Sequence, residues 1–198
     1  MTSQVPGSRR YQMVARAESA VATGERILLA ARALFGELSY DQVSLADVAT
    51  RAQVTVRTVV RRVGSKESLF AAVASERARS IRELRDQARS GDPSSGIETL
   101  LESYEKWGDE VLHLLSQERR SETIAASVER GRAYHQDWVK RVFGPCLPNL
   151  SPANRRRRIA QLTAVTDVYT WKILRRDLGL DREEVAATLR DMIVRITG

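Results

Sequence analysis

Apolar residues recur every three to four positions along most of the chain, a spacing that places them on one face of an α-helix. The first such segment runs from Gly24 to Leu38, and its apolar stripe consists of Ile27, Ala31, Leu34, Phe35 and Leu38. No segment alternates apolar and polar residues over the length of a strand between two turns. The sequence therefore predicts an all-α protein of about nine helices.

Two short apolar periods follow each other over residues 44–63, and each is too short to form a core alone. Ser44 and Asp47 have the spacing of a capping box at the start of the first period. A turn is expected around Gln53, and Thr55 can cap the helix that follows. Two short helices joined by a tight turn predict a helix-turn-helix, braced by the preceding helix.

The second of these helices has one apolar face and one basic face. On a helical wheel, Val56, Val59 and Val63 point inward, although Val56 could instead contact a thymine methyl group. An α-helix fits the major groove of DNA, where arginine pairs with guanine or binds phosphate. Lys66 stands at the start of the next helix, where another phosphate is expected. The predicted DNA-binding residues are Ser44, Thr55, Val56, Arg57, Thr58, Val60, Arg61, Arg62 and Lys66.

The chain from about Thr23 to Glu76 resembles the N-terminal domain of the TetR family of transcriptional regulators. The resemblance rests on three correctly spaced blocks, "ILLAARALF", "SYDQVSLADVATRAQVTVRTVVRRV" and "GSKESLFAAV". It implies a homodimer whose C-terminal domain binds a small-molecule effector and controls DNA affinity. A dimer presents two recognition helices to successive major grooves, so the operator is expected to be a near-palindrome.

Four positions depart from the usual pattern of this family. Gln53 stands in the turn where the family usually has glycine, and a non-glycine residue in a left-handed conformation costs about 1 kcal/mol or more. The turn is therefore adjusted, or Gln53 is tolerated. Val60 stands where a tyrosine commonly contacts phosphate, and Arg62 and Val63 replace a frequent histidine and a phenylalanine. Because valine donates no hydrogen bond, Arg61 and Arg62 are expected to supply phosphate contacts.

Beyond a loop at residues 90–96, the pattern predicts helices at residues 97–117, 121–143, 152–178 and 182–196. The last two resemble the helices that form a four-helix bundle with the twofold mate in the TetR family. Their apolar stripes, which a monomer would leave partly bare, indicate self-association. The predicted dimer-interface residues are Val168, Trp171, Leu174, Leu178, Val185, Leu189, Ile193 and Ile196.

Seven of the eleven aromatic residues fall between Tyr104 and Trp171. Aromatic residues at helical spacing ordinarily indicate core packing, although ligand pockets between helices are lined by the same side chains. His135, Thr166 and Asp167 could add polar groups to such a pocket. The family resemblance implies an effector pocket in this region, and the predicted residues are Tyr104, Trp107, His113, Tyr134, Trp138 and Tyr169.

Positive charge is concentrated near the N-terminus. The chain has a net charge of +7, and residues 1–66 contain ten basic and five acidic residues. A basic module beside a nearly neutral one is typical of nucleic-acid binding combined with a second role. The expected domains are a flexible basic tail at 1–18, a DNA-binding domain at 19–90 and an effector-binding and dimerisation domain at 91–198.

Two other basic groups each have two interpretations. Arg9, Arg10 and Arg16 could reach a minor groove, as N-terminal arms do, or belong to an untethered end. The run Arg155–Arg158 is either a solvated helix start or a second nucleic-acid site.

The sequence offers no set of residues for enzyme chemistry. The single Cys146 and the two histidines lack metal-ligand spacing, and no phosphate-binding loop or nucleophile motif occurs. We therefore expect no catalytic residue, metal or cofactor. No apolar run approaches the ~20 residues of a membrane span, and no signal peptide is recognised. A lone cysteine is typical of a reducing compartment, so a cytoplasmic protein is expected.

These features predict a sequence-specific DNA-binding transcriptional regulator, expected to be a repressor released by a small-molecule effector. Activation instead of repression is compatible with the same sequence. One alternative is a TetR-like ligand-binding protein without DNA function, which would tolerate charge reversal at Arg57 and Arg61. The other is a non-specific DNA binder, which would show strong salt dependence and no preferred site.

Overall fold

The computed structural model describes the backbone of residues 7–198 and the side chains from residue 19 onward. Regular structure in this part of the chain is helical throughout and includes no β-strand, which confirms the all-α prediction. The chain divides into two compact units, Met1–Ala74 and Ser75–Gly198. The division falls within α4 (Lys66–Arg85), whereas the sequence places the boundary beyond the end of that helix.

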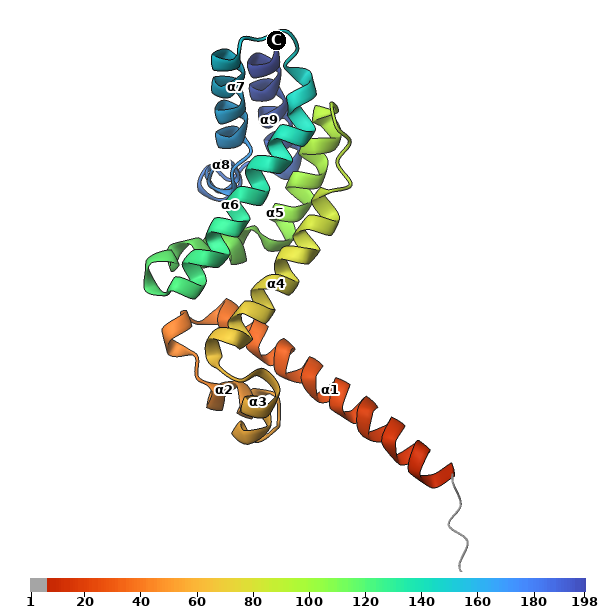
Figure 1. Ribbon diagram of the computed structural model, residues 1–198. Coiled ribbons are helices and arrows are strands. Elements are labelled where there is room, and N and C mark those ends of the chain that lie inside the picture. The colour runs from red at the N-terminus through yellow and green to blue at the C-terminus, as the bar shows by residue number, and fades with distance from the viewer. Residues whose placement is uncertain (1–6) are drawn as a thin grey trace, which may run out of the picture. The chain divides into compact units, whose positions relative to one another are not determined.

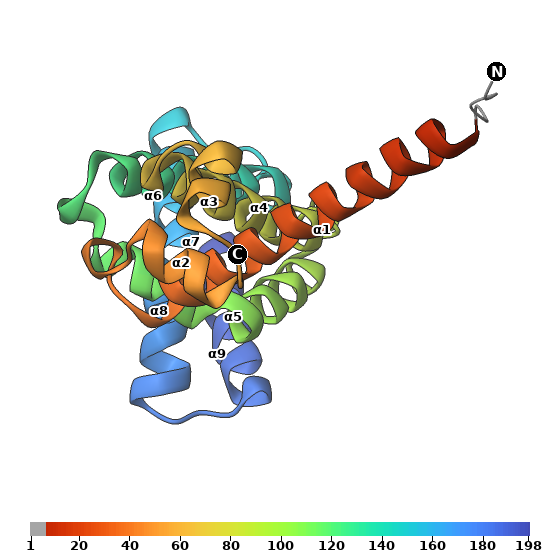
Figure 2. The same ribbon diagram turned by 90° about the horizontal axis from the view of Figure 1, so that it is seen from below.

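The first unit is a small helical domain built around one core. Its elements are α1 (Gly7–Glu37), a 3-10 turn (Tyr40–Gln42), α2 (Leu45–Arg51), α3 (Val56–Val63) and the first half of α4. Figure 1 and Figure 2 show α2 and α3 side by side. Phe70 of α4 makes edge-on ring contacts with Phe35 and Tyr40, at centroid distances of 5.2 and 5.3 Å. These rings link α4 to α1 and to the turn before α2.

Helix α1 begins at Gly7, well before the predicted start at Gly24. The coil expected for residues 1–18 is therefore replaced by helix from Gly7 onward. Intrinsic propensity explains the difference, because the segment after Pro6 contains no further proline before α1 ends and is rich in alanine and arginine. Such residues favour a helix even where no apolar face is present.

The two interpretations of the basic residues near the N-terminus, a minor-groove arm or an untethered end, are not tested by the structure. The side chains of Arg9, Arg10 and Arg16 lie outside the described ones, and residues 1–6 lie outside the described chain altogether.

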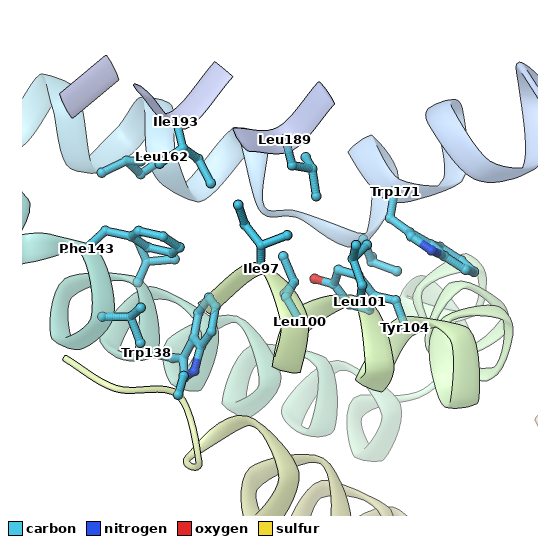
Figure 3. Close-up of a cluster of buried hydrophobic side chains, with 14 of the residues drawn as sticks. Ile97, Leu100, Leu101, Tyr104, Trp138, Phe143, Leu162, Trp171, Leu189 and Ile193 are labelled. Carbon is cyan, nitrogen blue, oxygen red and sulfur yellow. The ribbon is translucent and has the colours of Figure 1, made fainter. Parts of the chain in front are cut away.

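The second unit packs its helices around a single apolar core. Its elements after α4 are α5 (Pro93–Ser116), α6 (Glu122–Phe143), α7 (Pro152–Val165), α8 (Val168–Lys172), a π-helical turn (Ile173–Asp177) and α9 (Arg182–Thr197), with short 3-10 turns at Glu118–Arg120 and Gly144–Cys146. Figure 3 shows side chains from these helices meeting in the core. Ten of them are labelled: Ile97, Leu100, Leu101, Tyr104, Trp138, Phe143, Leu162, Trp171, Leu189 and Ile193.

One predicted helix is interrupted in the structure. The sequence predicts a single helix over residues 152–178, but α7 ends before Thr166 and α8 begins after Asp167. The Asp167 carboxylate accepts a hydrogen bond from the Tyr169 amide at 2.9 Å and caps the new helix. The Tyr104 hydroxyl donates to the carbonyl of Thr166 at 2.9 Å. Side chains therefore satisfy main-chain groups that the break exposes.

The apolar stripes of the last helices are buried within the protomer, contrary to the expectation that a monomer leaves them bare. Leu178 is 64% exposed and Ile196 is half-buried, while the other six predicted interface residues are buried. Helices α5 and α7 both pack on α9, and α5 also packs on α8. The stripes are thus core positions. The exposed large apolar side chains of this region are Tyr169, Ile173, Leu178, Met192 and Val194.

None of the helices that the structure describes has a stretch long and apolar enough to cross a bilayer. Histidine, cysteine and acidic side chains form no group of three or more with the arrangement of a metal site in this part of the chain.

Candidate nucleic-acid interface

A reciprocal capping box fixes the start of α2. The Ser44 hydroxyl donates to the Asp47 carboxylate at 2.6 Å and accepts from the Asp47 amide at 3.2 Å. The Ser44 amide donates to the same carboxylate at 2.9 Å. These bonds lower the pKa of Asp47 because they favour its charged form. The predicted capping box is confirmed, and the Ser44 hydroxyl is already engaged within it.

The turn between α2 and α3 is held from both sides. Gln53 has a φ of +55°, so it occupies the left-handed position of the turn and is tolerated there. Thr55 caps α3 by accepting from the Thr58 amide at 3.2 Å, and the two hydroxyls lie 2.9 Å apart. Arg51 of α2 contacts both carboxylate oxygens of Glu37 in α1, at 2.6 and 2.7 Å. The first helix thus braces the turn, as predicted.

Three arginines project from the outer side of α3. Val59 is fully buried beneath the helix, whereas Arg57, Arg61 and Arg62 are exposed. Arg57 and Arg61 are one helical turn apart and therefore share a face. In the part of the chain that the structure describes, none of the three forms a salt bridge or side-chain hydrogen bond. Their guanidinium groups are free to contact an anion.

Two valines lie on the same exposed side of the domain. Val56 and Val60 are 44% and 45% exposed, so the interpretation of Val56 as a core residue is wrong. Val56 shares its helical face with the half-buried Val63, but it lies in the first turn of α3, beyond the edge of the core. Exposed methyl groups beside arginines are suited to contacts with thymine methyl groups.

Lys66 points into the domain, contrary to the expected phosphate contact. Its ammonium donates to the carbonyls of Tyr40 and Val43, each at 2.9 Å, and lies 4.3 Å from the centre of the Tyr40 ring. These contacts tie the start of α4 to the segment before α2. No sequence pattern predicts these contacts, because the acceptors are main-chain carbonyls far away along the chain.

The basic run at the start of α7 is partly structural. Arg155 donates to the carbonyls of Leu147 and Gly144, at 2.8 and 3.0 Å, and Arg158 donates to the carbonyl of Arg195 at 3.3 Å. Two of the four arginines are therefore used in packing α7. This favours the interpretation of the run as a helix start.

The residues predicted for an effector pocket separate into two groups. Tyr104, Tyr134 and Trp138 surround one guanidinium, that of Arg85, at ring-centre distances of 5.7, 5.8 and 4.2 Å from its Cζ. Trp107 is buried but lies beside a different arginine, Arg77, at 5.2 Å. The remaining two residues are the half-buried His113, in the last turn of α5, and Tyr169, whose side chain is 51% exposed.

Arg85 is a central residue of this group that sequence reasoning missed. It is one of 32 basic residues, and its neighbours Arg82 and Arg89 are exposed. Arg85 is 4% exposed because it lies over Trp138 of α6. Ile81 lies one helical turn before Arg85 on the same face of α4, and this spacing was the available signal.

The helix-turn-helix matches a known family. Residues 27–73 match the model of the bacterial regulatory proteins, tetR family. The matched range includes all of α2 and α3, together with Gln53 in the turn, the cap residue Thr55 and the buried ammonium of Lys66. A comparison with curated proteins finds no match to the sequence.

Solved structures of bacterial regulators share the fold over most of the chain. A transcriptional regulator from Rhodococcus sp. Rha1 is 18% identical, with a TM-score of 0.67 over 87% of this chain and 95% of that one. A transcriptional regulator of the TerR/AcrR family from Aquifex aeolicus VF5 is 19% identical, with a TM-score of 0.61 over 88% and 99%. The fatty acid degradation regulator FadR from Bacillus halodurans is 15% identical, with a TM-score of 0.52 over 88% and 94%. The N-terminal helix-turn-helix thus matches the tetR family of bacterial regulatory proteins over residues 27–73, and the solved structures show that the fold is shared over the rest of the chain.

Proposed function

We propose that the protein is a sequence-specific DNA-binding transcriptional regulator that acts in the cytoplasm as a homodimeric repressor. The observation that carries this proposal is the pair of exposed arginines, Arg57 and Arg61, on the outer face of α3, whose guanidinium groups have no partner among the described residues. A helix of this kind enters the major groove, where an arginine fork pairs with guanine O6 and N7 or binds phosphate. Arg62, Thr55 and Thr58 lie beside this pair on the same short helix or at its cap.

A homodimer supports this function because two recognition helices about 34 Å apart read successive major grooves of a near-palindrome. The exposed apolar side chains near the C-terminus supply a surface for self-association. Ile173 and Leu178 lie on the segment between α8 and α9, and Met192 lies on α9. They replace the buried stripes as the proposed contact residues.

Release by a small-molecule effector supplies the regulation in this proposal. A ligand that binds one conformer of the second unit more tightly shifts the population towards it, and the shift is limited by the difference in affinity. Helix α4 contributes residues to both compact units. It is therefore the element through which binding in the second unit changes DNA affinity.

The test is a selection of bound sequences from a random duplex pool at near-physiological salt. We expect enrichment of a near-palindrome by the wild-type protein and loss of enrichment in the double variant Arg57→Ala, Arg61→Ala. The matched control is Arg156→Ala, Arg190→Ala, which removes two exposed arginines from the second unit. It should enrich the same sequence as the wild type.

The outcomes separate the proposal from its alternatives. Binding at low salt without any enriched sequence would indicate a protein that coats DNA through its charge. Absence of binding in the wild type, or equal binding by the Arg57 and Arg61 double variant, would indicate that α3 has no role in DNA recognition.

A further inference from the structure

Arg85 is a buried cation that forms no salt bridge with a carboxylate among the described residues. It lies in the last turn of α4 and is 4% exposed. None of the described salt bridges includes Arg85. The carboxylate of the neighbouring Asp86 is paired with Arg141 at 2.8 Å. A buried charge costs free energy unless an opposite charge and hydrogen bonds compensate it. The rings around its guanidinium offer partial compensation through cation–π contacts.

The one hydrogen bond of the Arg85 guanidinium goes to a neutral histidine. Its Nη2 lies 2.9 Å from Nδ1 of His135, and arginine can only donate, so Nδ1 is the acceptor. The proton of His135 is therefore on Nε2, which faces the Thr163 carbonyl at 3.4 Å and the Thr166 hydroxyl at 3.3 Å. Burial and the positive charge of Arg85 lower the pKa of His135 to about 3. His135 thus adds no negative charge to offset the guanidinium.

Two buried polar atoms in this part of the second unit have no hydrogen-bond partner among the described residues. One is Nε of Arg85, and the other is the hydroxyl of Ser103, a residue that is 1% exposed. Buried groups of this kind are rare in folded proteins, and a bound ion or an ordered water is one way in which such groups are satisfied. Both atoms can donate to an oxygen.

Helix packing brings Ser103 to the level of His135. A Cβ on Gly96 of α5 would lie 2.8 Å from the Val142 side chain of α6, so the two helices touch closely there. The helices run in opposite directions, and Ser103 and His135 each lie seven residues, or about two turns, from that contact on the same helical faces. Tyr104, next to Ser103, has its ring 5.7 Å from Cζ of Arg85. The two unpartnered donors therefore belong to one buried region.

We propose that this region binds the carboxylate of an anionic effector, with Arg85 as the anchor. One carboxylate oxygen accepts from Nε of Arg85, and the Ser103 hydroxyl donates to the same group. The planar fork of a guanidinium matches a carboxylate better than any neutral group. The apolar part of the ligand lies against the rings of Tyr104, Tyr134 and Trp138. The inference rests on the proposed function, because it names the chemical class of the effector that the regulator senses.

The test uses the full chain and two pairs of probes, each with the same apolar part and either a carboxylate or an uncharged amide as its head group. Benzoate and decanoate are compared with benzamide and decanamide by calorimetric titration and by the shift of the thermal unfolding midpoint. We expect at least one carboxylate to bind and raise the midpoint, while its amide does not. If neither carboxylate binds more tightly than its amide, the proposal is overturned.

Variants then assign the binding to the proposed anchor. Arg85→Gln should weaken carboxylate binding by about tenfold or more, which corresponds to the loss of one charge-assisted hydrogen bond. Arg79→Gln is the matched control, because it removes an exposed arginine of the same helix, one that pairs with Glu83 at 3.9 Å, and should leave affinity unchanged. Equal affinity in Arg85→Gln and the wild type would also overturn the proposal.

A second readout remains usable if Arg85→Gln does not fold. In the wild type, saturating carboxylate should raise the pKa of His135, measured by NMR, because the bound anion offsets the charge of Arg85. An unchanged pKa with bound ligand would place the ligand elsewhere. Since these measurements contain no DNA, a failed DNA selection beside Arg85-dependent carboxylate binding would refute the DNA-binding proposal alone.

Discussion

The guanidinium of Arg85 donates a hydrogen bond to Nδ1 of His135 at 2.9 Å in the interior of the second unit. Protonation of His135 would replace this acceptor with a second donor and place two positive charges side by side. The other charged residues that act on Arg85 are Asp86 and Asp167, and they favour its charged form. The pair therefore constrains how stability depends on pH.

We predict that the protein loses stability as the pH falls below about 6.5. Burial and Arg85 lower the pKa of His135 to about 3 in the folded state, so only the unfolded state takes up a proton between these values. Stability from this group is full above the unfolded pKa and declines by up to about 1.4 kcal/mol per pH unit below it. Urea unfolding at pH 7.0, 6.0 and 5.0 measures the slope.

The variant His135→Asn should flatten this dependence, because the asparagine oxygen can accept from Arg85 and does not titrate in this range. His113→Asn removes the other histidine and is the control. A flattened slope in His113→Asn, or an unchanged slope in His135→Asn, would contradict the assignment.

Much of the first unit could be predicted from local sequence. The caps at Ser44 and Thr55 and the turn at Gln53 depend on residues within three or four positions of one another, and the structure has all three. The position of Val56 could not be read in the same way. Whether a residue in the first turn of a helix is covered depends on where the rest of the domain ends.

Long-range contacts account for the remaining errors. The last two helices do have apolar stripes, but periodicity cannot tell whether the stripe of Val185 and Leu189 meets its own protomer or a second copy. Arg85 and His135 lie 50 positions apart, and their pairing depends on how α4 and α6 pack. The apolar spacing of α4 places Arg85 towards the buried face, but it does not identify His135 as the partner of the guanidinium.

Lys66 and Arg61 should respond differently to substitution. Lys66→Met removes the ammonium that donates to two main-chain carbonyl groups, so we expect a loss of about 1–3 kcal/mol in the free energy of unfolding. The salt dependence of DNA binding should not change, because the ammonium faces inward.

Arg61→Ala should have little effect on unfolding and should reduce the slope of log K against log salt by about 0.9 if it contacts one phosphate. If the slope of log K against log salt is also reduced in Lys66→Met, Lys66 does contact a phosphate, as expected from the sequence.

Gln53 holds a backbone conformation that favours glycine, with a φ of +55°. We predict that Gln53→Gly stabilises the protein by about 0.5–1 kcal/mol, since the relief of strain exceeds the entropy that glycine adds to the unfolded chain. The control Ala46→Gly, in the adjacent helix α2, should destabilise it by about 1 kcal/mol. Urea unfolding compares the two. A loss of stability in Gln53→Gly would show that the glutamine side chain makes a compensating contribution.

Leu178 offers the most direct test of the proposed dimer surface. Its side chain is 64% exposed, and burial of a leucine contributes about 1.5–3 kcal/mol. A twofold interface contains two copies of each residue, so Leu178→Glu should raise the dimer dissociation constant by more than about tenfold. Val21→Glu changes an equally exposed apolar residue in α1, at 62%, and should leave the dimer intact. Sedimentation equilibrium measures both variants. If Leu178→Glu forms a dimer as stable as the wild type, Leu178 lies outside the dimer interface. A dimer that reads two half-sites would then have to form through another surface of the protein.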